Sequence, residues 1–165
     1  MIRLSTDTDL AALERLYAVA FPEESLWPLV TALLKEPQTV SLVADEDGLI
    51  GHALYSKGSA TDARPALLGP LAVAPDAQRQ GWGKRLMAEG ATWLFGEGIT
   101  QILVLGDPAY YGRHGFSAET GIAPPYPLPD EWRGAWQSRM APGATPGSGT
   151  LTLPAPCMEP KYWQP

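Results

Sequence analysis

The segment Q-R-Q-G-W-G at residues 78–83 carries the residues of this chain that are best suited to chemistry. It follows an apolar run at residues 67–73, and a stretch with helical periodicity begins at Lys84. A glycine-bearing loop between a strand and a helix presents unpaired backbone N–H groups and the positive end of the helix dipole to a ligand. Arg79, Lys84 and Arg85 add positive charge in a chain whose formal charge is −6. The segment therefore predicts a binding site for a phosphate-bearing ligand.

Two other phosphate-binding loops fit the segment less well. The P-loop has a glycine where this chain has Gln78, and Arg85 stands where a Ser or Thr would hold magnesium. The dinucleotide fingerprint has a third glycine where this chain has Leu86. It also follows its strand directly, whereas a loop of seven residues separates Val73 from Gly81 here. A nucleotide-binding protein, stabilised by ATP or NAD, is the weaker alternative.

The spacing Gln78-x-x-Gly81-x-Gly83, after a strand and at the start of a helix, resembles motif A of the GNAT superfamily of N-acetyltransferases. The resemblance implies that the backbone N–H groups of this loop bind the pyrophosphate of coenzyme A, with acetyl-CoA as the co-substrate. Glycine at these positions lets a phosphate approach the backbone closely. The preceding strand is implied to pair with the pantetheine arm and the thioester carbonyl. The implied cofactor-binding residues are Leu71, Ala72, Val73, Gln78, Arg79, Gln80, Gly81, Trp82, Gly83, Lys84 and Arg85.

A second motif lies about thirty residues further along the chain. It reads Tyr111-x-x-x-Gly115-Phe116 and resembles the C-terminal signature of the same superfamily. The longer sequence pattern D-P-x-Y-Y-x-R-x-G-F, which begins at Asp107, is similar to the pattern of small bacterial YhbS-like proteins within the superfamily. Two short motifs in the expected order are more specific than either motif alone. The resemblance covers residues 1–118.

The resemblance implies an α/β (α+β) fold of the GNAT type, in which helices flank a mixed, mostly antiparallel central sheet. Helical periodicity and end signals predict one helix capped by Thr6 or Asp7, a second that begins at Glu24 or Ser25, and a third after motif A. β-rich runs predict strands at residues 1–4, 39–44, 49–56, 66–73 and 102–105, and residues 59–65 read as a loop.

The C-terminal part of the chain has a different composition. Ten of the 17 prolines lie in residues 124–165, which leaves little room for helix. We therefore expect a Pro-rich segment at residues 119–165 with one last strand of the sheet at residues 135–140. The whole chain, residues 1–165, is expected to be a single N-acetyltransferase domain.

Tyr111 is the candidate catalytic residue implied by the second motif. A phenol whose pKa is near 10 is protonated at neutral pH and can donate its proton to a departing thiolate. The general base is left open, because the strand before motif A contains no acidic residue. His52 lies on an apolar strand, which favours a hydrogen-bonded histidine in the core or at a sheet edge, and His114 is expected to be exposed. The candidates for the base are Glu23, Glu24, Asp107 and water.

These residues predict an acetyl-CoA-dependent N-acetyltransferase in which an amine attacks the thioester directly in a ternary complex. The missing strand acid motivates an alternative, a non-catalytic acyl-CoA-binding or regulatory module. The acceptor is a small-molecule or peptide amine whose identity the sequence leaves blank. An acidic chain favours cationic acceptors such as polyamines, aminoglycosides or lysine side chains. No metal site is predicted.

Composition and charge exclude several other classes of protein. A pI near 4.8 argues against a general nucleic-acid binder. The sequence has no apolar run of about 20 residues and no apolar signal-peptide core, so we expect no membrane association. A single cysteine, Cys157, excludes an internal disulfide and favours a cytoplasmic protein, and its thiol is expected to be unreactive, either on the surface or packed. Exposed edges of such sheets often pair between subunits, which leaves a homodimer open.

Overall fold

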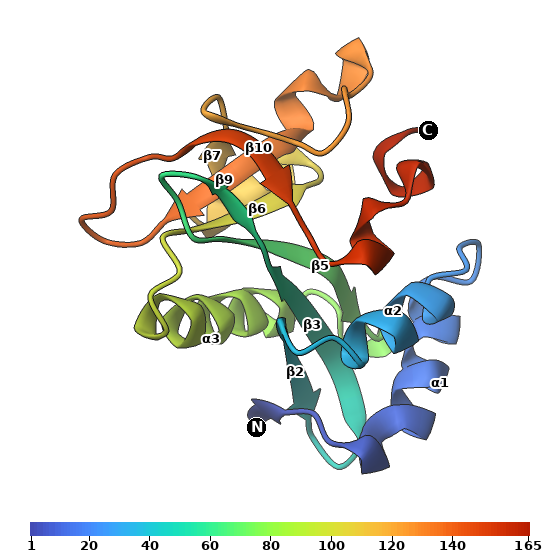
Figure 1. Cartoon of the computed structure of the whole chain (residues 1–165). Coiled ribbons are helices and arrows are strands. Elements are labelled where there is room, and N and C mark those ends of the chain that lie inside the picture. The colour runs from blue at the N-terminus through green and yellow to red at the C-terminus, as the bar shows by residue number, and fades with distance from the viewer.

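A seven-stranded sheet in the order β1-β2-β3-β5-β6-β9-β7 organises the computed structural model, which describes all residues 1–165 (Figure 1). Strands β5 and β6 are parallel, and every other neighbouring pair in this sheet is antiparallel. Helices flank the sheet, so the mixed, mostly antiparallel α/β (α+β) architecture predicted above is confirmed. The strands are β1 (Ile2–Leu4), β2 (Thr39–Asp45), β3 (Leu49–Lys57), β5 (Pro65–Val73), β6 (Gln101–Leu105), β7 (Ser117–Ala118) and β9 (Trp136–Met140).

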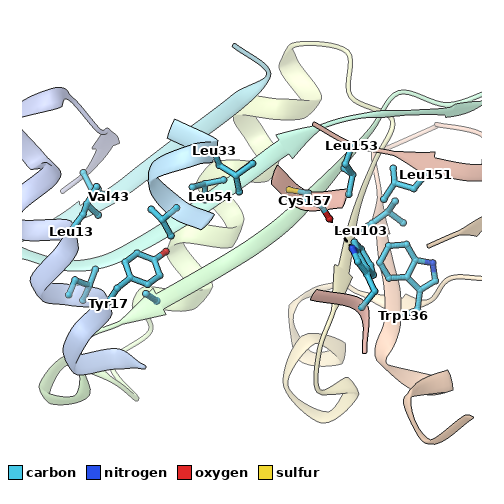
Figure 2. Packing of buried hydrophobic residues seen from close by; sticks show 14 of the residues in the cluster. Leu13, Tyr17, Leu33, Val43, Leu54, Leu103, Trp136, Leu151, Leu153 and Cys157 are labelled. Carbon is cyan, nitrogen blue, oxygen red and sulfur yellow. Dashed lines mark hydrogen bonds between the residues drawn. The ribbon is translucent and has the colours of Figure 1, made fainter. Parts of the chain in front are cut away.

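Two hydrophobic clusters lie on the two faces of this sheet. Alternate residues of a strand point to opposite faces, and in β3 Leu54 joins one cluster while Ala53 and Tyr55 join the other. The first cluster packs beneath helices α1 (Leu10–Ala20) and α2 (Trp27–Leu34), and the second packs beneath α3 (Trp82–Gly96). Figure 1 shows α3 apart from the α1–α2 pair, and Figure 2 shows the packing of the first cluster.

The C-terminal segment completes the first cluster. The strand expected at residues 135–140 is confirmed as β9, whose Trp136 is buried. Trp163 is also buried, its ring centroid is 5.8 Å from that of Trp136, and its Nε1–H donates to the carbonyl of Cys157 (2.9 Å). The Cys157 thiol is buried and donates to Ser56 Oγ (3.6 Å), so it is packed and does not lie on the surface. The C-terminal segment is therefore anchored in the core through Cys157 and Trp163.

The sequence prediction missed a second, three-stranded sheet. It has the order β4-β10-β8 and is built from β4 (Ser59–Thr61), β8 (Ile122–Ala123) and β10 (Ser148–Thr152). The loop predicted at residues 59–65 is therefore wrong at its start, and β10 was not expected at all. Strand β4 pairs with β10 almost ninety residues later. Strands this short and largely polar have no alternation of apolar and polar residues that would predict them from the sequence. Only their pairing with a distant segment defines them.

The starts of all three predicted helices also differ from the prediction. Helix α1 begins at Leu10, because the residues that follow the predicted cap Thr6 first form a 3₁₀ turn. Helix α2 begins at Trp27 and not at Glu24 or Ser25, with Pro28 in its first turn, where the missing N–H of proline costs nothing. Helix α3 begins two residues before Lys84, directly after Gly81. The short elements are the 3₁₀ turns η1 (Asp7–Asp9), η2 (Pro75–Ala77), η3 (Gly112–His114), η4 (Asp130–Ala135), η5 (Ala155–Met158) and η6 (Pro160–Trp163), and helix α4 (Pro108–Tyr111).

His52 is a hydrogen-bonded histidine, as predicted, and of the two places left open, core or sheet edge, it occupies the core. It is fully buried, and its Nδ1 lies 2.7 Å from the Tyr17 hydroxyl while its Nε2 lies 2.8 Å from Ser41 Oγ. Burial lowers the pKa of His52 to about 3, so the ring is neutral and both of its nitrogens have partners. The residue connects α1 to the sheet and has no role in the site described below.

Arg3 fixes the N-terminal strand to the start of the first helix. Its guanidinium donates to both carboxylate oxygens of Asp9 (2.8 and 2.9 Å) and to Asp45 Oδ2 (2.9 Å). The Arg3 hydrogen bonds lower the pKa of Asp9 to about 2. Because this pKa is below the unfolded value near 3.9, the ionised Asp9 stabilises the fold above about pH 4. That contribution is lost as the pH falls through 2.

Arg3→Met is therefore expected to lower the free energy of unfolding by about 1–3 kcal/mol at pH 7, since it leaves two carboxylates without their partner. The difference from the wild type should shrink as the pH approaches 2. Urea unfolding at several pH values measures it. Arg133→Met is the matched control, because Arg133 pairs with Asp130 in full solvent and such pairs contribute little. A difference for Arg3→Met that stays constant with pH would contradict the ionic explanation.

Candidate functional site

A cleft opens in the centre of the large sheet, where β5 and β6 part. Residues 65–67 of β5 pair with residues 101–103 of β6, and the pairing stops there. Beyond this point β5 continues along β3, and β6 continues along β9. A bulge lies at the same place, because Gly69 and Pro70 of β5 stand opposite Leu54 alone. Bulges bend a strand and end its pairing, so the strand sequence itself opens the cleft.

The backbone of β5 presents alternate N–H groups to this cleft. The N–H of Ala74 donates to the carbonyl of Ile50 (2.8 Å), which continues the pairing with β3. Because successive peptide groups of a strand point to opposite sides, the N–H of Ala72 also faces β3, and those of Leu71 and Val73 face the cleft. Of the three residues of β5 that the resemblance implied, Leu71 and Val73 thus present their N–H groups to the cleft, whereas Ala72 is buried and its N–H group faces away from it.

The loop after β5 ends in free N–H groups at the start of α3. Gly81 has φ +85° and directly precedes the helix. The first hydrogen bond of the helix runs from Arg85 N–H to the Gly81 carbonyl (3.0 Å). The N–H groups of Trp82, Gly83 and Lys84 therefore have no helical acceptor. They and the helix dipole form an anion site of the kind that the sequence predicted.

These groups line a pocket of about 680 Å³, which we call the loop pocket. Arg79, Lys84 and Arg113 supply its positive charge. The predicted residues Ala72, Gln80 and Arg85 do not line it. Arg85 instead lies over the Trp82 ring, with its guanidinium carbon 4.5 Å from the ring centroid, and Gln80 Nε2 donates to the Asp76 carbonyl (3.2 Å). The predicted cofactor-binding residues that line the loop pocket are Leu71, Val73, Gln78, Arg79, Gly81, Trp82, Gly83 and Lys84.

Gly83 has a packing role that the sequence did not reveal. A Cβ built at this position would collide with the Tyr110 hydroxyl of α4. Only glycine allows α4 to pack this closely against the first turn of α3. Tyr110 also lines the loop pocket, so this contact places the second motif beside the first.

Tyr111 lies where two pockets meet. Its ring packs edge-on against Phe116 (5.6 Å between centroids) and Tyr110 (5.0 Å), and it covers Gly106, where a Cβ would collide with the ring. Burial, with a smaller contribution from Tyr110, raises the pKa of Tyr111 to about 12. The phenol is therefore protonated at neutral pH, as its proposed role requires.

The second pocket, of about 440 Å³, we call the C-terminal pocket. It is lined by the separating ends of β5 and β6, by the segment between α1 and α2, and by residues 161–164 near the end of the chain. Phe21, Leu71 and Tyr111 line both pockets. We call these three residues the junction.

The candidates for the general base are separated by the structure. Glu24 lines the C-terminal pocket, whereas Glu23 lines neither the loop pocket nor the C-terminal pocket. Asp107 caps α4, since its Oδ1 accepts from the N–H of Ala109 (2.9 Å). Its carboxylate therefore has a local structural partner, and it lines neither of these pockets.

His114 differs from its expected exposure. It is half-buried in the loop pocket, its ring lies 4.9 Å from that of Tyr110, and its buried Nδ1 has no hydrogen-bond partner. Burial lowers its pKa, and so do the nearby charges of Arg113 and Lys84. The i,i+4 spacing from Tyr110 on a helical turn was the signal that could have placed it here. The sequence contains no comparable spacing that would have predicted the aromatic and leucine residues of the C-terminal pocket.

A model of the acetyltransferase (GNAT) family matches residues 9–116 of the chain. This chain belongs to the GNAT family. The uncharacterised N-acetyltransferase YjhQ of Escherichia coli K12 is 34% identical over 154 residues, which cover 87% of this GNAT chain and 82% of YjhQ. No helix of this family member has the length and apolar composition that crossing a membrane requires.

Two solved structures of the GNAT family share this fold. The crystal structure of YhbS from Escherichia coli in complex with CoA has a TM-score of 0.82 at 24% identity and covers 96% of this chain and 92% of its own. An acetyltransferase from Brucella melitensis in complex with acetyl-CoA has a TM-score of 0.75 at 30% identity and covers 94% of this chain and 96% of its own. The expected GNAT fold and the resemblance to YhbS-like proteins are confirmed.

Proposed function

We propose that this protein is an acetyl-CoA-dependent N-acetyltransferase in which a primary amine attacks the thioester directly, in a ternary complex. The observation that carries the proposal is the meeting of two pockets at Tyr111 in the cleft between β5 and β6. One pocket has the free N–H groups and cations that suit a phosphate-bearing donor. The other shares only the junction residues with it and suits an acceptor. Two substrates bound in the two pockets can therefore meet at the junction.

The residues of the loop pocket fit coenzyme A. The pyrophosphate would accept from the N–H groups of Trp82, Gly83 and Lys84, with Arg79 and Lys84 neutralising its charge. The pantetheine arm would follow β5, where Leu71 and Val73 present N–H groups that β3 leaves free. The donor of the acetyl group is thus held by backbone groups along its length.

In the transfer step the amine nitrogen forms a bond to the thioester carbon and the C–S bond breaks. A backbone N–H of β5 that faces the cleft stabilises the negative charge that develops on the carbonyl oxygen. Tyr111 donates its phenolic proton to the departing thiolate and recovers a proton from solvent. The amine loses its proton to water or, through water, to Glu24. Glu24 is the one of the three candidate acids that lines either pocket.

A second candidate function is a non-catalytic acyl-CoA-binding or regulatory module. The observation that favours it is the junction itself, whose three side chains are Phe21, Leu71 and Tyr111 and include no base. Such a module would bind acetyl-CoA and release no CoA with any amine. Assays of CoA release over a panel of amines distinguish the two functions.

We also propose that residues 1–165 act as one N-acetyltransferase domain located in the cytoplasm. The buried Trp163 and Cys157 pack in the same cluster as Leu13 and Val30, which supports a single folding unit. The single buried cysteine supports a reducing compartment.

Acetyl-CoA at 100 times its dissociation constant is expected to stabilise the protein by about 2.7 kcal/mol. For a chain of this size the thermal midpoint should rise by roughly 5–10 °C. Thermal unfolding with acetyl-CoA, and with ATP and NAD as controls, measures the shift. A rise of the thermal midpoint with ATP or NAD instead, or no rise at all, would refute the proposed acetyl-CoA site and with it the proposed enzymatic function.

A further inference from the structure

Apolar residues from four segments of the chain make up most of the lining of the C-terminal pocket. β5 contributes Leu67 and Leu71, β6 contributes Leu105, the α2 region contributes Leu26 and Leu29, and the end of the chain contributes Trp163. An apolar ligand in this pocket would displace water from these side chains. The walls therefore favour an acceptor with an apolar body.

Only two charged residues line this pocket, and one of them is already paired. Lys161 Nζ lies 3.2 Å from Glu159 Oε2 and 5.2 Å from the centroid of the Tyr162 ring. The other charged residue, Glu24, takes part in none of the salt bridges of the chain. The pocket thus offers one free carboxylate to a cationic ligand.

The position of Glu24 assigns that carboxylate to the reacting amine. The Glu24 N–H donates to the carbonyl of Phe21 (3.2 Å), so Glu24 lies one turn from a junction residue. Its carboxylate can pair with the ammonium group beside the junction and, through water, accept the proton that the amine loses as it reaches the thioester. At the junction the apolar surroundings disfavour the charged ammonium, which lowers the pKa of the amine and supplies the neutral nucleophile. A strong base on β5 is then not required.

A second ammonium group on the same acceptor would have no anionic partner, because Glu24 is already used by the reacting amine. The other charged residue of the pocket, Lys161, is a cation, and most of the remaining residues that line the pocket are apolar, so an unpaired charge is disfavoured there. This local argument opposes the general expectation that an acidic chain prefers polyamines or aminoglycosides. We expect the composition of the pocket to determine which acceptor is preferred, because the acceptor is bound there, whereas the net charge of the chain acts only at long range.

The end of the chain fixes the size of the pocket. Trp163 is held by its hydrogen bond to Cys157 and by its contact with Trp136. The turn η5 contacts α2, and Figure 1 shows this C-terminal part (red) beside that helix. The wall is thus part of the packed core, and a volume of about 440 Å³ suits a small molecule.

We propose that the C-terminal pocket selects a small primary monoamine with an apolar aliphatic or aromatic body, and that Glu24 positions its ammonium group. This inference rests on the proposed function, because it names the acceptor class of the same site. Polyamines, aminoglycosides and lysine side chains are excluded as preferred acceptors.

The test uses matched amines with the chain of residues 1–165 at saturating acetyl-CoA. Hexylamine and 1,6-diaminohexane have the same length and differ in one ammonium group. 2-Phenylethylamine tests an aromatic body, and spermidine, kanamycin and a lysine-containing peptide represent the excluded classes. The expected result is a kcat/KM at least tenfold higher for hexylamine than for 1,6-diaminohexane. Both apolar monoamines should exceed all three excluded acceptors.

Substitutions at neighbouring glutamates test the role of Glu24. Glu24→Gln should raise the KM for hexylamine about three- to tenfold with little change in the KM for acetyl-CoA. Glu23→Gln is the matched control, because Glu23 is adjacent, exposed and absent from the pocket, and it should leave both constants unchanged. Gln164→Glu adds a second carboxylate at an exposed position of the pocket and should narrow the preference for hexylamine over the diamine.

Binding provides a readout that does not depend on catalysis. Calorimetric titration of hexylamine and of 1,6-diaminohexane into the CoA-bound protein should show tighter binding of the monoamine. A preference for spermidine, kanamycin or the peptide would overturn the inference and leave the acetyltransferase in place. Equal effects of Glu24→Gln and Glu23→Gln would also overturn it. Binding of the monoamine without CoA release would keep the pocket assignment and refute the proposed enzyme.

Discussion

Tyr111→Phe is expected to lower kcat about 100-fold while the dissociation constant of acetyl-CoA changes less than twofold. The substitution removes only the hydroxyl group, and the ring contacts with Phe116 and Gly106 remain. Loss of a positioned proton donor costs roughly 10²–10⁴ in rate. Steady-state kinetics with an accepted amine give kcat, and calorimetry gives the affinity for acetyl-CoA.

The adjacent hydroxyl provides the comparison. Tyr110→Phe removes a phenol that faces the start of α3, and its effect on kcat should be less than threefold. An equal loss in the two variants would point to packing of α4 and not to proton donation. An unchanged kcat in Tyr111→Phe would remove this residue from the mechanism.

The pH dependence gives a second check on Tyr111. Because burial raises its pKa to about 12, the phenol keeps its proton well above the ordinary value near 10. The wild-type kcat should therefore not fall between pH 8 and pH 10 through loss of this proton. A decline over that interval that is absent in Tyr111→Phe would contradict the assignment.

The parts of the fold that the sequence predicted are those with a local pattern. Helical spacing placed α1 and α3, and an uninterrupted apolar run placed β6, which is buried along most of its length. Motif A and the Tyr111 motif placed both halves of the loop pocket, because each is a short segment with a fixed position at a helix end. The histidine on an apolar strand was correctly predicted to be hydrogen-bonded, but whether it lay in the core or at an edge was left open.

The remaining features depend on contacts between distant segments. Strand β10 exists because it pairs with β4, and the C-terminal pocket exists because Trp163 returns to the core formed by α1 and α2. The backbone direction of Ala72 follows from its pairing with β3, and Arg85 turns toward Trp82 although it follows Lys84 directly. A sequence motif includes residues that are adjacent in the chain without telling which of them face the ligand. Only the register of the strand or helix decides which way each of them faces.

The same reasoning explains why the sequence predicts a donor site and leaves the acceptor class open. The site that we propose for the donor consists mainly of backbone groups and the positive end of one helix, and both follow from local sequence. The pocket that we propose for the acceptor is lined by side chains from β5, β6, the α1–α2 segment and the C-terminal segment. The chemistry of that pocket depends on the contacts between these four segments, which no local pattern encodes.

Lys84 lines the loop pocket and Arg85 does not, and this difference leads to the second large expected effect. In the double variant Arg79→Glu/Lys84→Glu the dissociation constant of acetyl-CoA should rise about 30- to 150-fold. Both residues line the loop pocket beside the free N–H groups. Reversal of two charges close to the phosphates costs about 2–3 kcal/mol in this partly solvated site, which converts to that range.

Matched controls separate this local effect from net charge. Arg85→Glu should weaken binding less than fivefold, because Arg85 lies over Trp82 and outside the pocket. Lys35→Glu/Arg133→Glu changes the net charge by the same amount at two exposed sites outside the pocket and should leave the affinity nearly unchanged. With S-acetylpantetheine, which lacks the phosphates, the loop variant and the wild type should have similar kcat/KM values. A loss of the same size with this truncated donor would mean that the loop supports the fold of the cleft and does not bind phosphate.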